Sequence, residues 1–140
     1  MRAMSRATTK NVFVYGTLKQ GRPLDRPEFA SLRTNVRPAS IVGSIYSLGA
    51  YPTIQLDGQG IVQGEVHSFS EQDFGCVLDL MDRIEGYDAS NPSAGLYTRH
   101  VVDATLLDHK GETIRAWVYE YNGDVNSSRR LAGGVWEPGM

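Results

Sequence analysis

The chain has 140 residues, 41% hydrophobic and 21% charged, which suits one globular domain that buries a core without disulfide staples. The net charge of −2 lies in no acidic or basic block, so neither nucleic acid nor a membrane is an expected partner. No secretory signal precedes the domain and there is a single cysteine, Cys76, so we expect a cytoplasmic protein.

The N-terminal part of the chain combines a polar tail with a short buried strand. Residues 1–10 are predicted to be a disordered tail, and residues 11–140 to be one domain. The apolar run Asn11–Tyr15 predicts a strand that the next glycine ends. Gly16–Gly21 has the glycine spacing of a phosphate loop, but the following Arg-Pro replaces the residues that phosphate and magnesium need. We expect either an ordinary turn or backbone N–H groups that hold an anion or an oxyanion.

The middle of the chain alternates loops with short strands. Three prolines limit residues 17–38 to loop, with at most a short helical turn at residues 27–33. Further strands are predicted over residues 41–48, 53–56 and 61–69.

One convincing helix follows. Ser70 is a good N-cap and Gly86 a natural C-terminal stop. At about 100° per residue the helix carries one apolar stripe. The stripe consists of Phe74, Val77, Leu78, Met81 and Ile84. Glu85 falls inside it, Asp82 lies near its margin, and Cys76 lies on the far side, where it is a bystander rather than a nucleophile.

Glu85 is the leading candidate for chemistry. A carboxylate on a buried helical face is costly unless it is paired or neutral. Its pKa is expected to rise, which suits a general base that works near neutral pH. The alternative is a structural glutamate that reaches solvent from the helix end or pairs with a buried arginine such as Arg99.

The C-terminal part of the chain predicts a hairpin. After a loop over residues 89–95, strands over residues 97–108 and 113–121 are joined by a turn at residues 109–111. The tail over residues 122–140 is predicted to be irregular, with Trp136 as an anchor. These elements predict an α+β fold, a small mixed or antiparallel β-barrel of about six strands with one main packed helix.

Other chemistries lack their motifs. His67, His100 and His109 are far apart and match no metal spacing, so no metal site is expected. There is no Gly-x-Ser-x-Gly element for a nucleophilic serine. Tyr97 and Tyr119 lie on strands, where a tyrosine hydroxyl that faces a cavity can hold a substrate or a carboxylate.

Several segments together carry a resemblance to a known family. They are Val12–Gly21, Tyr51–Pro52, Gly64–Val66, Leu80–Gly86, Tyr97–Arg99 and Ala116–Tyr119. Their order resembles the gamma-glutamylcyclotransferase-like family, including the gamma-glutamylamine cyclotransferases, over residues 11–121. The resemblance implies a small barrel of about six strands with short helices outside it.

The resemblance also implies a reaction. The alpha-amine of a gamma-glutamyl compound attacks its own gamma-carbonyl and releases 5-oxoproline and a free amine, with no cofactor or metal. The family's catalytic glutamate maps onto Glu85. The loop that holds the glutamyl part maps onto the backbone of Tyr15, Gly16, Thr17 and Leu18. Tyr119 is a further candidate partner for the substrate or for Glu85.

Three classes of function therefore stay open. The first is a cofactor-independent cyclotransferase of the lyase or acyltransferase type, a monomer or weak homodimer acting on a small gamma-glutamyl molecule. The second is a hydrolase or transferase that acts on a related amide in the same cavity. The third is a small-ligand-binding protein that keeps the fold without turnover. The sequence does not name the amine that would be released.

Overall fold

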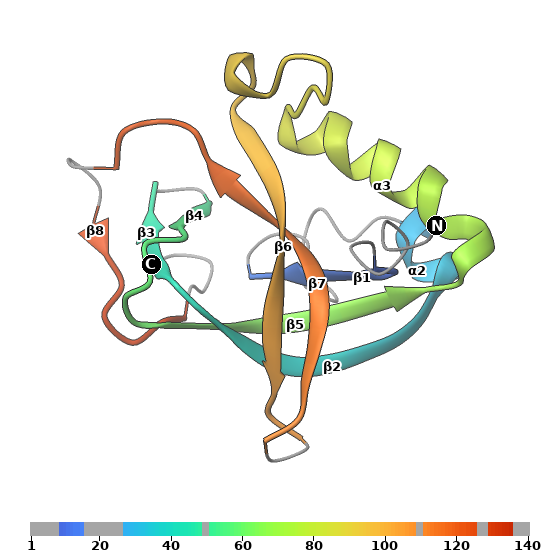
Figure 1. Cartoon of the computed structure of the whole chain (residues 1–140), viewed down its shortest axis with the longest axis horizontal. Helices are drawn as coiled ribbons and strands as arrows, with labels where there is room; N and C mark the ends of the chain where they lie inside the picture. The colour runs from blue at the N-terminus through green and yellow to red at the C-terminus, as the bar shows by residue number, and fades with distance from the viewer. Residues whose placement is uncertain (1–8, 16–26, 49–50, 109–110, 126–128, 136–140) are drawn as a thin grey trace, which may run out of the picture.

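The computed structural model describes residues 9–15, 27–48, 51–108, 111–125 and 129–135, which form two sheets with helices packed beside them (Figure 1). A closed barrel is formed by five strands in the order β1 (Asn11–Val14), β5 (Ile61–Phe69), β2 (Arg33–Val42), β6 (Tyr97–Leu106) and β7 (Thr113–Tyr121). A three-stranded sheet is formed by β4 (Pro52–Gln55), β3 (Ser44–Ser47) and β8 (Arg129–Arg130). The helices are α2 (Pro27–Leu32), α3 (Glu71–Glu85) and the 3₁₀ turn η1 (Pro92–Ala94).

The barrel closes where its first and last strands meet. β1 runs parallel to β7, with Val12 opposite Trp117, while its pairing with β5 is antiparallel. β5 carries Gly64 where it approaches β1, and a Cβ there would collide with the Val14 carbonyl and the Phe13 ring. A glycine is therefore required for the two strands to approach this closely.

Two apolar cores hold the elements together. The barrel interior contains Phe13, Tyr15, Ala39, Ile41, Val62, Val66, Ala104, Leu106, Ala116 and Val118, with Ile45 and Ile54 from the second sheet and Leu131 directly after β8. The second core lies outside the barrel, where Val12, Val14, Phe29, Phe69, Tyr97 and Tyr119 pack with Val77 and Met81 of α3. Alternation along β7 explains this division, because Ala116 and Val118 face the interior while Trp117 and Tyr119 face the helix.

The main helix has the boundaries that its capping residues predict. The Ser70 hydroxyl accepts a hydrogen bond from the Asp73 N–H at 3.2 Å, and Gly86 adopts a left-handed φ of 71° at the C-cap. Figure 1 shows α3 along one side of the barrel, ending close to the chain that leads into β6. The predicted helix is confirmed, and its C-terminal end brings Glu85 toward the barrel.

The prediction of a loop over residues 17–38 is wrong for residues 33–38. The strand β2 begins at Arg33 and pairs with β5 along its length. Its first half is polar and partly exposed, so it lacks the apolar run that predicts a strand. Pro38 is tolerated within β2, and its carbonyl accepts a hydrogen bond from Leu107 N–H at 2.9 Å.

The strand predicted over residues 41–48 is also corrected. It is divided at Gly43 between β2 of the barrel and β3 of the second sheet. The apolar residues continue across the division because both halves contribute to the barrel core. The predicted hairpin is confirmed by the pairing of β6 with β7, and the short strand β8 lies within the predicted irregular tail.

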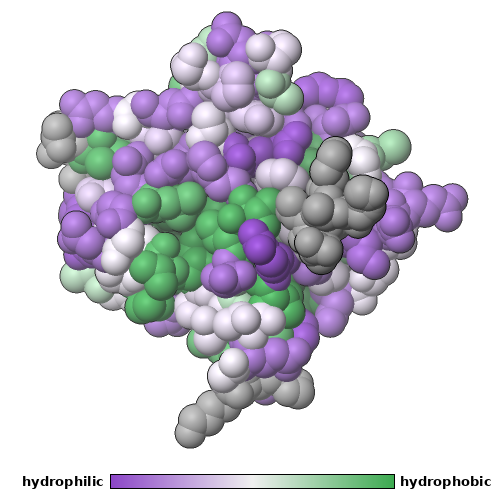
Figure 2. All heavy atoms as spheres, in the orientation of Figure 1, coloured by the Kyte–Doolittle hydropathy of each residue, from purple (hydrophilic) through white to green (hydrophobic). Residues whose placement is uncertain are grey.

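Of the predicted N-terminal tail, only Thr9 and Lys10 are described, and the Lys10 carbonyl accepts a hydrogen bond from Phe69 N–H at 3.1 Å. Figure 2 shows mostly hydrophilic residues around one apolar area left of its centre. No helix within the described ranges is long and apolar enough to cross a membrane.

Candidate active site

Glu85 occupies the last turn of α3 on the side that faces the barrel. Val77 and Met81 of the same stripe are buried, and Ile84 packs against the second core. Glu85 is half-buried, whereas Asp79 and Arg83 on the other face are exposed. The helical wheel therefore predicted the orientation of this carboxylate correctly.

The environment of Glu85 favours its neutral form. Burial raises the pKa of the Glu85 carboxyl from its ordinary value of 4.5 to about 7. None of the described residues forms a hydrogen bond or ion pair with this carboxylate. A carboxyl group with this pKa exists in both protonation states near neutral pH, as a general acid and base requires.

Arg99 does not pair with Glu85, so the predicted alternative of a pairing between these two residues is wrong. The Arg99 guanidinium binds Asp82 instead, with Nε 2.8 Å from Oδ1 and an Nη 3.2 Å from Oδ2. The guanidinium also lies over the rings of Tyr87 and Trp117, at 4.9 and 4.6 Å from their centroids. The ion pair and both aromatic contacts fix Arg99 beside Asp82, which lies one helical turn before Glu85 in α3.

Tyr119 belongs to this same cluster. Its hydroxyl donates a hydrogen bond to Asp82 Oδ1 at 2.7 Å, so β7 and β6 both hold the end of α3. Burial is the main cause that raises the Tyr119 pKa well above its ordinary value, and the nearby Glu85 adds to it. The proton of Tyr119 is thus used to position the helix that carries Glu85, rather than left free for a ligand.

Two further buried tyrosines are influenced by the charge of the Glu85 carboxylate. Tyr15, at the end of β1, and Tyr97, at the start of β6, are 8% and 7% exposed. Burial raises the pKa of both phenols, and the charge of Glu85 raises each of them further. Tyr15 donates its hydroxyl proton to the Tyr119 carbonyl at 2.8 Å. The charge of Glu85 therefore acts on hydroxyl groups that remain protonated at neutral pH.

Tyr15 is the only residue of the predicted substrate loop that the structure describes. Gly16, Thr17 and Leu18 lie outside the described residues. The described Tyr15 adjoins them directly and lies close enough to Glu85 to sense its charge. Tyr15 is therefore the one residue of this loop whose position relative to Glu85 the structure describes.

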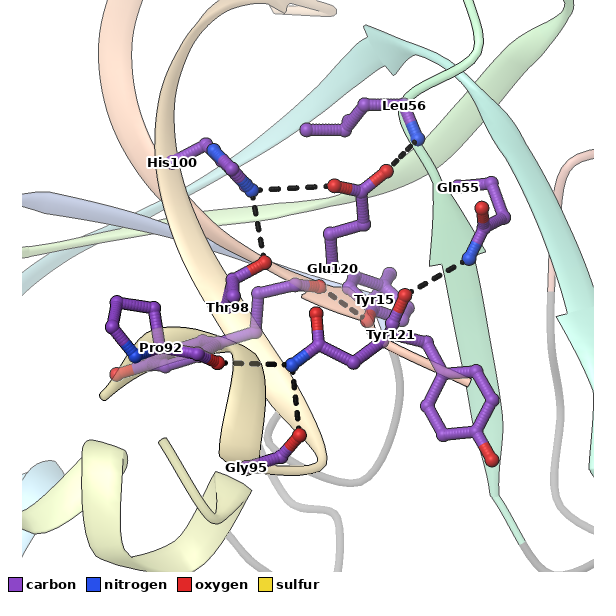
Figure 3. Close-up of polar contacts among 11 residues, drawn as sticks. Tyr15, Gln55, Leu56, Pro92, Gly95, Thr98, His100, Glu120 and Tyr121 are labelled. Atoms are coloured by element: carbon purple, nitrogen blue, oxygen red, sulfur yellow. Dashed lines mark hydrogen bonds and ion pairs between the residues drawn. The ribbon is translucent and has the colours of Figure 1, made fainter. Parts of the chain in front are cut away.

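Polar contacts fasten the elements around this end of the barrel (Figure 3). The Glu120 carboxylate accepts a hydrogen bond from Leu56 N–H at 2.7 Å and lies 3.2 Å from His100 Nε2. Gln55 Nε2 donates to the Tyr121 carbonyl at 3.0 Å, which ties the end of β4 to β7. The Asn122 side chain donates to the carbonyls of Pro92 and Gly95 in the loop that follows α3.

The sequence did not predict the Asp82–Arg99 pair. It predicted Tyr97 only as a strand residue whose hydroxyl can face a cavity. The sequence places Asp82 at the margin of the apolar stripe and suggests Arg99 only as a partner of a buried glutamate. The pairing joins residues that are 17 positions apart in the chain. The available signal was a second acidic residue on the inner side of the helix, opposite a strand that carries an arginine.

Other regions do not add to this site. A groove of about 520 Å³ lies near the N-terminal half of α3, lined by residues that include Glu71, Phe74, Leu78 and Trp117. It lies at the other end of the helix from Glu85. Within the part of the chain that the structure describes, no three His, Cys, Asp or Glu side chains form a metal site. His67 is paired with Glu65 at 2.9 Å, and His109 is outside the described residues.

Fold and site together define an α+β barrel protein with one desolvated carboxylate at the end of the barrel. The family model for gamma-glutamyl cyclotransferases of the AIG2-like type matches residues 12–138. The chain therefore belongs to this family. The resemblance carried by the sequence motifs is confirmed.

Individual relatives agree with the assignment. The chain is 33% identical over 116 residues to the gamma-L-glutamyl-butirosin B gamma-glutamyl cyclotransferase of Niallia circulans, covering 81% of this chain and 68% of the relative. A mouse AIG2-like protein superimposes with a TM-score of 0.69 at 22% identity, covering 92% of this chain and 88% of that one. YkqA of Bacillus subtilis superimposes with a TM-score of 0.61 at 22% identity, and this chain spans only 40% of its length. These structures share the fold with this chain.

Proposed function

We propose that the protein is a gamma-glutamyl cyclotransferase in which Glu85 is the general acid and base. The substrate is a small gamma-glutamyl compound, and the products are 5-oxoproline and a free amine. The observation that carries the proposal is the Glu85 carboxylate, half-buried and unpaired among the described residues, with a pKa raised to about 7. Family membership over residues 12–138 supports the same reaction.

The reaction begins with removal of a proton. The substrate's alpha-amine is an ammonium group near neutral pH and has no lone pair for attack. The Glu85 carboxylate takes one proton, and the alpha-nitrogen then forms a bond to the gamma-carbonyl carbon. Because the nucleophile is tethered to its electrophile, orientation supplies much of the acceleration, with effective molarities of about 10⁵ M or more. The nucleophile is part of the substrate, so the step uses no cofactor.

Collapse of the tetrahedral intermediate completes the reaction. The bond between the gamma-carbon and the leaving nitrogen breaks as that nitrogen receives a proton from Glu85. In total, two protons move from the alpha-nitrogen to the leaving nitrogen, which departs as an ammonium group, and the lactam nitrogen keeps one. A single carboxyl group with a pKa near the working pH can carry both transfers.

Substrate binding is assigned to the loop after β1. In this proposal the backbone N–H groups of Tyr15, Gly16, Thr17 and Leu18 hold the glutamyl alpha-carboxylate. The charge of Glu85 contributes to the raised pKa of Tyr15, which supports a position of the alpha-amine near the base when the carboxylate is bound in the loop. Tyr119 acts through Asp82 to position the helix rather than by contact with the substrate.

The experiment is a product assay on a panel of gamma-glutamyl substrates. The panel contains gamma-glutamyl amino acids, gamma-glutamyl alkylamines, gamma-glutamyl-lysine and gamma-L-glutamyl butirosin B, since the relative of Niallia circulans bears the last in its name. Mass spectrometry distinguishes 5-oxoproline from glutamate. We expect 5-oxoproline with at least one substrate; glutamate instead would indicate a hydrolase, and neither product across the panel would contradict the proposal.

A further inference from the structure

The segment over residues 92–96 lies directly on the end of the helix that carries Glu85. Leu96 N–H donates a hydrogen bond to the Gly86 carbonyl at 3.1 Å, and Gly86 is the residue that follows Glu85. A Cβ at Gly95 would collide with the same carbonyl oxygen. A glycine is therefore required for the 92–96 segment to approach the last turn of α3 this closely.

An apolar side chain of this segment lies over the helix end. A Cβ at Gly86 would be 3.5 Å from Leu96 Cβ and 3.6 Å from Leu96 Cδ1, which is ordinary van der Waals contact. Leu96 itself is 62% exposed, so it forms the outer surface at this point. The leucine thus lies between solvent and the residue next to Glu85.

Asn122, directly after β7, tethers the segment to the barrel. Its side-chain Nδ2 donates hydrogen bonds to the Pro92 carbonyl at 3.1 Å and to the Gly95 carbonyl at 2.7 Å (Figure 3). Its backbone N–H donates to the Leu96 carbonyl at 2.8 Å. One asparagine therefore holds both ends of the 92–96 segment.

The 92–96 segment has no charge with which to act on Glu85. Its sequence, Pro-Ser-Ala-Gly-Leu, contains no acidic or basic residue. On α3, the charge of Asp82 is paired with Arg99, and Asp88, in the loop before the segment, is exposed and bonds within its own loop. The barrel contributes three phenols on which the charge of Glu85 acts, those of Tyr15 in the residue after β1, Tyr97 of β6 and Tyr119 of β7. The segment can therefore influence Glu85 only by excluding water and by holding the helix end.

We propose that the 92–96 segment is a cover that keeps water from Glu85, and that Gly95 and Asn122 are positioning residues for the reaction because they hold this cover on α3. The role in turnover rests on the proposed cyclotransferase function, whereas the covering of Glu85 does not. Displacing the cover hydrates the carboxyl group, which lowers its pKa. It also frees the last turn of α3, which misplaces the base relative to the alpha-amine.

Two substitutions displace the cover by different routes. Gly95→Ala adds a Cβ where the Gly86 carbonyl leaves no room, and Asn122→Ala removes both side-chain tethers. The matched controls are Gly133→Ala, at a position with open space around it, and Asn91→Ala, an exposed asparagine whose side chain does not cap η1. The Tm of each variant shows whether it is folded.

The pKa of Glu85 is measured directly and without substrate. Protein labelled with ¹³C at its glutamate carboxyl groups is titrated by NMR, and the Glu85 signal is identified by its absence from Glu85→Gln. We expect a midpoint near 7 in the wild type and in both controls. In Gly95→Ala and Asn122→Ala the midpoint should fall by about one pH unit or more, toward the ordinary value of 4.5.

Rates of 5-oxoproline formation test the consequence for turnover, with the panel substrate that the wild type converts fastest. At pH 8 we expect both cover variants to lose about tenfold in kcat, because the base is misplaced. KM should change less than about threefold, since the loop assigned to substrate binding is not altered. The acidic limb of kcat/KM should move to lower pH together with the NMR midpoint, which a general loss of stability would not cause.

Several results would overturn this assignment. A Glu85 midpoint in folded Asn122→Ala that equals the wild-type value shows that the segment does not cover the carboxylate, and an equal shift in Asn91→Ala shows that Asn122 has no special role. If Gly95→Ala does not fold, Asn122→Ala alone decides. A lowered midpoint with unchanged kcat overturns the positioning role. Wild-type protein that forms no 5-oxoproline across the panel instead contradicts the proposed function, while the titration still decides whether Glu85 is covered.

Discussion

At the residue scale, the proposed chemistry depends on Glu85 having no hydrogen-bond or ion-pair partner among the described residues. Its pKa is raised to about 7 by burial, while the neighbouring Asp82 is paired with Arg99 and Tyr119. Two carboxylates one helical turn apart thus have different environments. This difference supports the proposed acid–base role for Glu85 and a structural role for Asp82.

The pH dependence of turnover follows from this pKa. Because Glu85 must be ionised to accept the proton of the alpha-amine, kcat/KM should fall as the pH drops below the pKa of Glu85 in the free enzyme. We expect an acidic limb with a midpoint near pH 7. A pH profile of 5-oxoproline formation measures it, and a limb centred near pH 4.5 would show that Glu85 is solvated like an ordinary glutamate.

The same carboxyl group should make stability depend on pH. Its folded-state pKa is above the unfolded value of 4.5, so its ionisation opposes folding, and stability is lost as the pH rises from 4.5 toward 7. Glu85→Gln removes this cost and should raise the free energy of unfolding at pH 8 by up to about 3 kcal/mol, with little change at pH 4. Urea unfolding at both pH values measures the difference, and a variant less stable than the wild type at pH 8 would mean that the carboxylate is paired.

Sequence alone located Glu85 because helical periodicity reports which side chains face inward. It did not locate the cluster of Asp82, Arg99 and Tyr119, since the hydroxyl and carboxylate that meet are 37 positions apart.

At the element scale, the end of α3 is held by side chains from two strands. Asp82 accepts from Arg99 of β6 and from Tyr119 of β7. Asn122 adds bonds to the loop that follows the helix. The position of Glu85 therefore depends on contacts made outside α3 itself.

Removing this attachment should reduce both stability and activity. Asp82→Asn leaves the Arg99 cation without its anion, in a pair whose side chains are only 16% and 14% exposed. We expect a loss of about 2 kcal/mol in unfolding free energy and about a tenfold lower kcat, because the base is displaced. Asp79→Asn, on the exposed face of the same helix, is the control. Equal effects of the two substitutions, by urea unfolding and initial rates, would contradict the role of Asp82.

Capping residues explain why the boundaries of α3 were predictable and those of β2 were not. Ser70 and Gly86 define the helix ends by local hydrogen bonds and local backbone conformation. Residues 33–38 of β2 form a strand because β5 offers a partner along its whole length, and no local pattern reports that partner. Long-range pairing overrides the polar, proline-containing sequence there.

At the scale of the whole molecule, closure of the barrel depends on a close approach between β1 and β5. Gly64 lies against the Val14 carbonyl and the Phe13 ring, and Tyr15 follows directly after this contact. The fold class was predicted from the number and kind of elements. The division of the strands into a five-stranded barrel and a separate three-stranded sheet was not, because it depends on pairing between distant segments.

Glycine substitutions test this architecture. Gly64→Ala should lower the unfolding free energy by about 1–3 kcal/mol, because the added Cβ collides with backbone. Gly75→Ala should raise it by up to about 1 kcal/mol, since this helical position has open space around it and alanine favours helix. Urea unfolding of both variants measures the contrast, and a Gly64→Ala variant as stable as the wild type would show that the strands can separate freely.

The most direct test of the account is the rate of 5-oxoproline formation by wild type and Glu85→Gln on the same substrate at pH 8. Glu71→Gln, an exposed glutamate at the other end of α3, is the matched control. We predict that Glu85→Gln remains folded and loses at least about 100-fold in kcat, as expected for a lost general base, while Glu71→Gln retains wild-type rates. A folded Glu85→Gln variant that forms 5-oxoproline within tenfold of the wild-type rate would contradict the assignment of Glu85 as the base.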